Sequence, residues 1–181
     1  MTDMPRLPGD VPAGKNVERM IRVDHAGEYG AARIYAGQIA VLGRGAKGDT
    51  LRHMQAQEQR HLDTFDALIA DRRVRPTALL PLWNLAGVAL GAATAALGER
   101  AAMACTVAVE ETIDAHYAGQ VAELGDDEGA LRDTVERFRR EELEHRDTAL
   151  AHDAERAPGY RLLTAAIRAG CRAAIKLSER V

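Results

Sequence analysis

Apolar side chains recur every three or four residues along most of this chain, which is the period of an α-helix with one buried face. No segment alternates apolar and polar residues as a half-buried strand does, so no strand is predicted. The pattern predicts amphipathic helices at about 17–42, 50–75, 99–124, 126–157 and 160–178.

Local signals set the ends of these helices. Gly43 and Gly48 are expected to terminate the first helix, because glycine favours the turn that follows a helix. Asp49 or Thr50 is expected to cap the second helix. Pro158 is expected to break the fifth.

Composition narrows the class of protein. The net charge of −3 argues against a partner bound through bulk positive charge, so no nucleic-acid partner is predicted. Cys105 and Cys171 lie 66 residues apart in no paired motif, and are expected to be small core residues in a reducing compartment. Residues 1–15 carry three prolines and no apolar or arginine-rich run, so they are expected to form a flexible N-terminal tail. Residues 16–181 are then expected to form one domain.

Carboxylates interrupt the apolar stripes, alone or with histidine. Glu58 and His61 form a Glu-x-x-His pair, as do Glu142 and His145, and at this spacing both side chains of a pair share one helix face. Single inward glutamates precede the two pairs by 30 and 32 residues, and these are Glu28 and Glu110. One Glu from each of two helices plus a Glu-x-x-His from the other two is the ligand set of di-iron and di-manganese carboxylate bundles.

The charges of this set suit two divalent cations. Four carboxylates neutralise two M²⁺ ions, and an oxygen-rich shell with one imidazole per ion favours iron or manganese over zinc. The competing interpretation is a set of solvated carboxylates with structural histidines, but two matching pairs with upstream glutamates are hard to obtain by chance.

Neighbouring polar residues leave alternatives open. The choice of Glu110 over Glu111 depends only on the apolar stripe around it, and Glu111, Glu141 and Glu144 are expected to face solvent or to support the ligands. Asp24 and Asp114 could orient the ligand imidazoles through their second N–H, or could be exposed. Structural roles are favoured over gating of substrate or protons for His25, His116 and His152.

At these residues the sequence resembles the demethoxyubiquinone hydroxylases, the di-iron monooxygenases of ubiquinone biosynthesis. The resemblance extends from about residue 16 to the C-terminus. It is carried by RVDHAGEYGA (22–31), RIYAGQ (33–38), RVRPT (73–77), PLWN (81–84), AMACTVAVEE (102–111), EELEH (141–145) and LSER (177–180).

The resemblance implies the fold, the ligands and the reaction. The fold is an all-α, ferritin-like four-helix bundle with two additional helices, an apolar crossover helix and a basic C-terminal helix. The reaction is hydroxylation of the ring of 6-demethoxyubiquinol (2-polyprenyl-3-methyl-6-methoxy-benzoquinol) by two Fe²⁺ ions and O₂, with electrons from an external reductant such as NADH. His116 or Tyr117 would position the quinol. The iron ligands are Glu28, Glu58, His61, Glu110, Glu142 and His145, which also selects Glu110 over Glu111.

Residues 77–98 contain no charged side chain, and as a helix they would reach about 33 Å, enough to cross a bilayer core. A crossing would place the two halves of the ligand set on opposite sides of the membrane. A crossover helix that lies partly in the membrane interface is therefore predicted, with Trp83 at the headgroup level and the arginines at 72–75 beside it. The alternative is a helix packed wholly in the core or against a partner protein.

The last predicted helix and its tail, residues 160–181, carry five basic residues against one acidic residue, and anionic lipid attracts such an element. Peripheral association with the cytoplasmic face of a bacterial inner membrane is predicted, or with the mitochondrial inner membrane for a eukaryotic member without its presequence. A lipid-binding protein of the ubiquinone-synthesis complex is an expected partner. Two other classes remain as alternatives, an iron-storage bundle and a scaffold or lipid-binding bundle with a structural metal.

Overall fold

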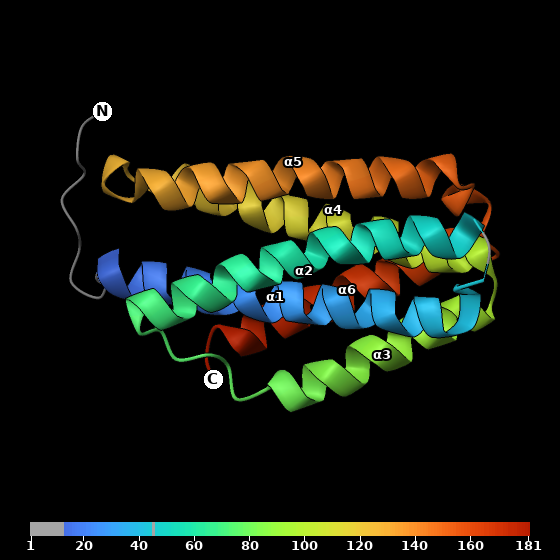
Figure 1. The fold of residues 1–181 in the computed structure, drawn as a ribbon, viewed down its shortest axis with the longest axis horizontal. Helices are drawn as coiled ribbons and strands as arrows, with labels where there is room; N and C mark the ends of the chain where they lie inside the picture. The colour runs from blue at the N-terminus through green and yellow to red at the C-terminus, as the bar shows by residue number, and fades with distance from the viewer. Residues whose placement is uncertain (1–12, 45) are drawn as a thin grey trace.

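The computed structural model describes residues 13–44 and 46–181, and this part of the chain is helical with no strand (Figure 1). Single 3₁₀ turns at Asp126–Glu128 and Ala154–Arg156 interrupt the later connections. The helices are α1 (Ala13–Leu42), α2 (Ala46–Arg72), α3 (Leu80–Ala96), α4 (Glu99–Glu123), α5 (Gly129–Ala151) and α6 (Tyr160–Ser178).

Two helical hairpins, α1–α2 and α4–α5, form the four-helix bundle (Figure 1). The connection between the hairpins is α3, which runs along α1 and returns the chain to the end where α4 begins. Helix α6 packs on α4. The all-α, ferritin-like bundle with an apolar crossover helix and a C-terminal helix is thus confirmed.

Apolar clusters fill the two ends of the bundle. One contains Phe65, Tyr117 and Phe138, and the other contains Leu51 and Met103. The middle of the bundle lies between these clusters, where polar side chains are held away from water.

Glycines bring α3 unusually close to α1. A Cβ atom at Gly91 would lie 2.0 Å from the backbone oxygen of Ile34, and one at Gly37 would lie 2.3 Å from that of Val88. At Gly87 it would lie 2.9 Å from the oxygen of Gly30. Only glycine permits these backbone approaches, so the three residues set the position of the crossover helix.

Three predicted helix ends are wrong. Helix α2 begins at Ala46, so Asp49 lies in its first turn and is not its cap. Gly48 packs against the backbone of Gly43, where a Cβ atom would lie 2.4 Å from the Gly43 oxygen. Helix α5 ends at Ala151, because Asp153 adopts a left-handed conformation with φ of 61°. Helix α1 begins at Ala13, so residues 13–15 of the predicted tail are helical, and the rest of that tail lies outside the described residues.

One face of α3 contacts the bundle and the other is open. Leu85 is 69% exposed and Leu82 is 50% exposed, so the alternative in which this helix is packed wholly within the core does not hold. Among the described residues, no helix has both the length and the apolar character that crossing a membrane requires.

We predict that Gly91→Ala destabilises the protein. Alanine favours helix over glycine by about 1 kcal/mol, but the added methyl group would overlap the Ile34 backbone, and overpacking of this kind costs about 1–3 kcal/mol. Thermal unfolding followed by circular dichroism should show a lower Tm. The matched control is Gly119→Ala in α4, where a Cβ meets nothing within 4 Å and the Tm should rise. An unchanged or higher Tm for Gly91→Ala would contradict the proposed role of the glycine contact.

Candidate metal centre

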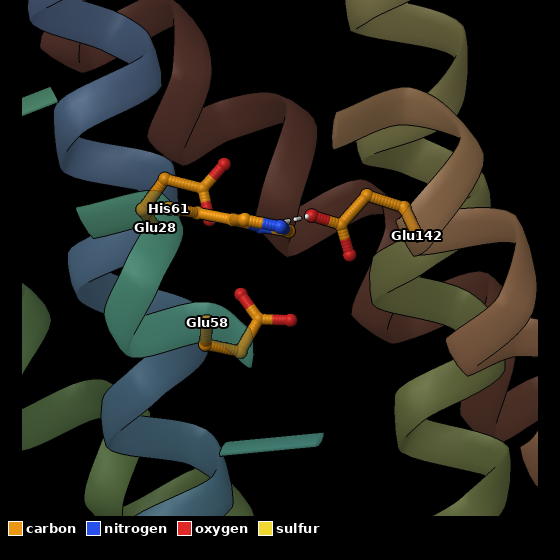
Figure 2. A group of neighbouring side chains, drawn as sticks. All are labelled: Glu28, Glu58, His61 and Glu142. Atoms are coloured by element: carbon orange, nitrogen blue, oxygen red, sulfur yellow. Dashed lines mark ion pairs between the residues drawn. The ribbon is translucent and has the colours of Figure 1, made fainter. Parts of the chain in front are cut away.

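Six polar side chains from the four bundle helices converge between the apolar clusters. Each is at most 2% exposed. Figure 2 shows four of them pointing into the space between the helices. The six are Glu28 from α1, Glu58 and His61 from α2, Glu110 from α4, and Glu142 and His145 from α5.

The side chains form two groups, each suited to one ion. In each group the candidate ligand atoms lie within 4.8 Å of one another. Glu58 and Glu142 belong to both groups, so their carboxylates are placed to bridge two ions. Glu28 and His61 complete the first group, and Glu110 and His145 complete the second.

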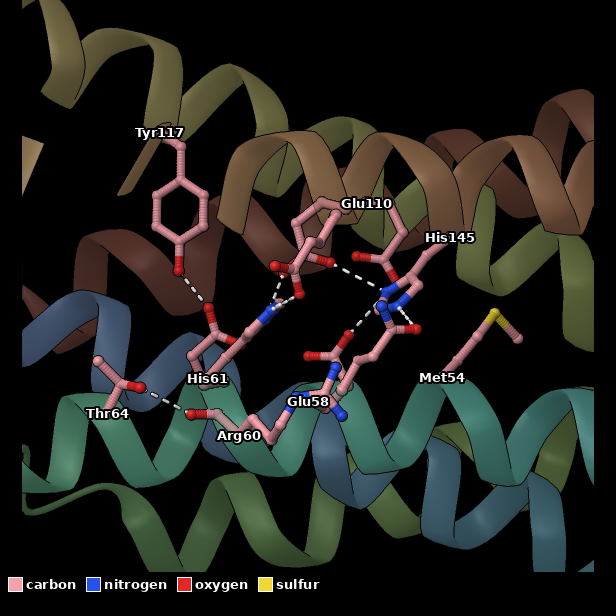
Figure 3. Close-up of polar contacts among 12 residues, drawn as sticks. Met54, Glu58, Arg60, His61, Thr64, Glu110, Tyr117 and His145 are labelled. Atoms are coloured by element: carbon pink, nitrogen blue, oxygen red, sulfur yellow. Dashed lines mark hydrogen bonds and ion pairs between the residues drawn. The ribbon is translucent and has the colours of Figure 1, made fainter. Parts of the chain in front are cut away.

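Short contacts link imidazoles and carboxylates across the bundle (Figures 2 and 3). His61 Nδ1 lies 3.0 Å from Glu142 Oε1 and 3.4 Å from Glu28 Oε2. His145 Nδ1 lies 3.0 Å from Glu58 Oε1 and 3.2 Å from Glu142 Oε2. Glu142 therefore faces both imidazoles.

The donor atoms at the centre of this group fit a pair of metal ions. Both imidazole Nδ1 atoms, both oxygens of Glu58 and of Glu142, and one oxygen each of Glu28 and Glu110 are buried, and apart from the imidazole–carboxylate contacts within the cluster they have no hydrogen-bond partner. Buried polar atoms normally have hydrogen-bond partners, and atoms left without one at a convergent cluster are free to coordinate a cation. The donor set is oxygen-rich with one imidazole per group, which suits iron or manganese.

Burial and mutual repulsion perturb these carboxyl groups. Burial, followed by repulsion from Glu142, raises the pKa of Glu58 and of Glu110 well above the usual range. Burial also raises the pKa of Glu28. Burial acts in the same direction on Glu142, but contacts with His145 and His61 outweigh it and lower its pKa to about 2.

The carboxylates in turn make the two imidazoles more basic. Burial disfavours their charged forms, but the adjacent carboxylates raise the pKa of His61 to about 12 and that of His145 to about 11. Without metal, both side chains therefore carry the proton that partly balances the buried negative charge.

The outer nitrogen of each imidazole is held by the residue that precedes the glutamate of the opposite motif. His61 Nε2 lies 2.9 Å from a carboxylate oxygen of Glu141, and His145 Nε2 lies 3.1 Å from the amide oxygen of Gln57. Because both partners accept, Nε2 donates and Nδ1 is directed to the centre. His61 also stacks on Phe138, with ring centroids 4.0 Å apart.

Two buried tyrosines orient the single glutamates. The Tyr117 hydroxyl donates to Glu28 (Figure 3). The Tyr35 hydroxyl donates to Glu110 at 2.8 Å. The resemblance implied that His116 or Tyr117 positions the substrate. The structure places the Tyr117 hydroxyl against Glu28, and His116 lies against Asp24.

Asp24 and Asp114, for which orienting the imidazoles was one of two open interpretations, do not contact these rings. Asp24 accepts from Gln120 at 2.7 Å and lies 3.1 Å from His116, and Asp114 pairs with Arg139. Asp24 and Asp114 share helix faces with Glu28 and Glu110 on α1 and α4. The imidazoles lie on α2 and α5, and their outer nitrogens find acceptors on these two helices. Gln57 was not predicted, although its place directly before Glu58 matches that of Glu141 before Glu142.

The remaining candidates take structural positions. Glu111 pairs with Arg168 of α6 and Glu144 is exposed, so neither joins the cluster. The other polar contacts are His25 with Asp66 and His152 with Glu99. Cys105 is buried and Cys171 is partly buried, and both are free.

An apolar cavity of about 580 Å³ lies between α1, α3, α4 and α6. Ile34, Trp83, Val109 and Ile167 are among its lining residues, and almost all of its surface is apolar. Its walls include Gly27 and Val109, which directly precede Glu28 and Glu110 along the chain. The cavity therefore adjoins the helices that carry two of the candidate ligands.

Comparison with known proteins identifies relatives along nearly the whole chain. A sequence model of the family described as "Ubiquinone biosynthesis protein COQ7" matches residues 15–178. A 3-demethoxyubiquinol 3-hydroxylase of Rhodospirillum rubrum is 60% identical over 177 residues, 97% of this chain and 84% of the relative. The human mitochondrial NADPH-dependent 3-demethoxyubiquinone 3-hydroxylase is 56% identical over 169 residues, 91% of this chain and 78% of the relative.

We predict that Gln57→Leu weakens metal binding by about 10- to 100-fold, because His145 would lose the acceptor that fixes its ring. Gln57→Glu should retain binding, since a carboxylate accepts from the opposite imidazole at Glu141. Competition with a chelator measures the affinity. Gln59→Leu, at an exposed position two residues on, is the matched control. Equal affinities for Gln57→Leu and Gln59→Leu would contradict this role for Gln57.

We also predict that metal loading of the metal-free protein releases protons. The raised pKa values of the two imidazoles and of three carboxyl groups keep protons on atoms that must be free to bind a cation. Affinity should therefore rise with pH. Calorimetric titration with Mn²⁺ in two buffers of different ionisation enthalpy measures the release, and equal heats in both would refute it. His53→Ala, at an exposed histidine, should leave the release unchanged.

Proposed function

The chain belongs to the ubiquinone biosynthesis protein COQ7 family, and on that basis we propose that it is a 3-demethoxyubiquinol 3-hydroxylase. Relatives that match 91–97% of this chain are named as hydroxylases of demethoxyubiquinol or demethoxyubiquinone. The proposed reaction is hydroxylation of the ring of 2-polyprenyl-3-methyl-6-methoxy-benzoquinol by a di-iron, O₂-dependent monooxygenase.

The observation that carries the proposal is the set of six buried candidate ligands whose central atoms have no hydrogen-bond partner outside the cluster. Two iron ions bound there would supply the binding and activation of O₂, of which one oxygen enters the ring and the other leaves as water, with two electrons from an external reductant. Glu58 and Glu142 would help to hold both ions, since both belong to each group. Glu28 with His61, and Glu110 with His145, would complete the two coordination shells.

The residues around the ligands would keep the centre dry and oriented. Tyr117 and Tyr35 would hold the single glutamates through hydrogen bonds, and Gln57 and Glu141 would hold the imidazoles. The apolar clusters on both sides exclude water, which strengthens the electrostatic interactions between the chain and the reacting groups.

The apolar cavity is the proposed site for the quinol and the first part of its polyprenyl chain. A polyprenyl quinol is insoluble in water, and a cavity lined by apolar side chains can receive it without the loss of buried hydrogen bonds. An iron-storage bundle binds no organic substrate and needs no apolar cavity. The cavity therefore supports the hydroxylase over the iron-storage alternative.

Peripheral attachment to a membrane is proposed for delivery of this substrate. The exposed Leu82 and Leu85 of α3, and Leu162 of the basic α6, would enter the interface. The proposed location is the cytoplasmic face of a bacterial inner membrane, and the human, mouse and yeast relatives are named as mitochondrial. A lipid-binding protein that presents the quinol is a proposed partner.

We predict that protein loaded anaerobically with Fe²⁺ converts a short-chain demethoxyubiquinone into a product 16 mass units heavier when a nicotinamide reductant and O₂ are added. Mass spectrometry follows the product, with NADH and NADPH compared as donors. Glu142→Ala should lose both iron and turnover, because this carboxylate faces both imidazoles. The matched control is Glu144→Ala at an exposed position of the same helix. Absence of product from protein with full iron occupancy would refute the hydroxylase assignment.

A further inference from the structure

The glycines within the helices differ in whether a side chain at their position would have room. At Gly37, Gly87 and Gly91, a side chain would collide with the neighbouring helix. At Gly27, Gly30 and Gly170, a Cβ would meet nothing within 4 Å. Packing therefore explains the first group and leaves the second unexplained.

Glycine at an open position inside a helix is unfavourable by itself. It raises the conformational entropy lost on folding, and alanine at the same place would stabilise the helix. Gly27 and Gly30 lie in the interior of α1, and Gly170 lies in the interior of α6. The backbone conformation at these positions does not require glycine either, since none of them has a positive φ.

All three glycines line the apolar cavity. Gly27 and Gly30 line it from α1, and Gly170 lines it from α6. The two glycines of α1 lie on either side of Glu28 along the chain, so the cavity wall without side chains is next to a proposed iron ligand.

We propose that Gly27, Gly30 and Gly170 determine the substrate specificity of the cavity by their lack of side chains. The inference rests on the proposed function for the class of ligand, a substituted benzoquinol with an isoprenoid tail. Such a ring is wider than an unbranched acyl chain because methyl and methoxy groups project from its edge. Glycines on α1 and α6 keep the cavity wide enough for these substituents, at the cost of helix stability.

The chain contains its own reporter for a ligand in this cavity. Trp83 is the single tryptophan of the sequence, it lines the cavity, and its indole N–H donates to Ser178 Oγ at 3.0 Å. Quinones quench indole fluorescence on contact. Titration of the metal-free protein with decylubiquinone, followed by Trp83 emission, therefore measures occupancy without any turnover.

The test compares alanine and leucine at Gly30 and Gly170. Each alanine variant should raise the Tm by about 2–4 °C, because the methyl group has room and favours the helix. Decylubiquinone should bind more weakly in the alanine variants, and on the order of tenfold or more weakly in the leucine variants, whose side chains extend into the cavity. Gly119→Ala is the matched control, since its open space faces a separate pocket near Arg19 and Glu123. It should raise the Tm without changing the titration.

Three results would overturn the inference. They are an unchanged quinone affinity in both leucine variants, an alanine variant with a lowered Tm, and a wild-type protein whose Trp83 emission does not respond to the quinone. The outcome of the hydroxylation assay is independent of the outcome of the quinone-binding test. If iron-loaded wild type makes no product but the leucine variants lose quinone binding, the specificity role stands and the hydroxylase assignment fails.

Discussion

The burial of four carboxylates with two imidazoles in the middle of the bundle is the constraint on which the rest of the structure depends. A buried charge without a partner is strongly unfavourable, so all six groups must meet if the four helices are to close. Contacts of 3.0 Å between imidazole and carboxylate show how closely the helices must be aligned. The apolar clusters at both ends hold that alignment, and they also remove the water that would otherwise solvate the charges.

The two halves of the centre support each other across the bundle. The residue before the glutamate of each Glu-x-x-His motif accepts a hydrogen bond from the histidine of the other motif. The outer nitrogen of each histidine is therefore held by the opposite hairpin. This exchange couples the geometry of one ion site to the packing of both hairpins.

Around the crossover helix, some glycines allow close helix packing and others leave space open. Close backbone contacts at Gly87 and Gly91 hold α3 against α1, and the open glycines Gly27 and Gly30 lie on α1 itself. Helix α3 thus forms a wall of the cavity while its Leu82 and Leu85 are exposed. One face of α3 therefore lines the cavity, and the opposite face forms an exposed apolar surface.

The sequence by itself determined the helices and the six residues of the centre, since helical periodicity is local and a carboxylate on an apolar stripe is visible without coordinates. It also indicated α3 as a crossover, because a membrane crossing would have separated the ligands. The tertiary structure decided which polar neighbours matter. Gln57 and Asp24 are equally polar in the sequence, but only the packing of α2 against the opposite hairpin brings Gln57 to His145 and leaves Asp24 with His116. It also decided the roles of the glycines, because the distance from a glycine to a neighbouring helix depends on how the helices pack, and local sequence does not encode that distance.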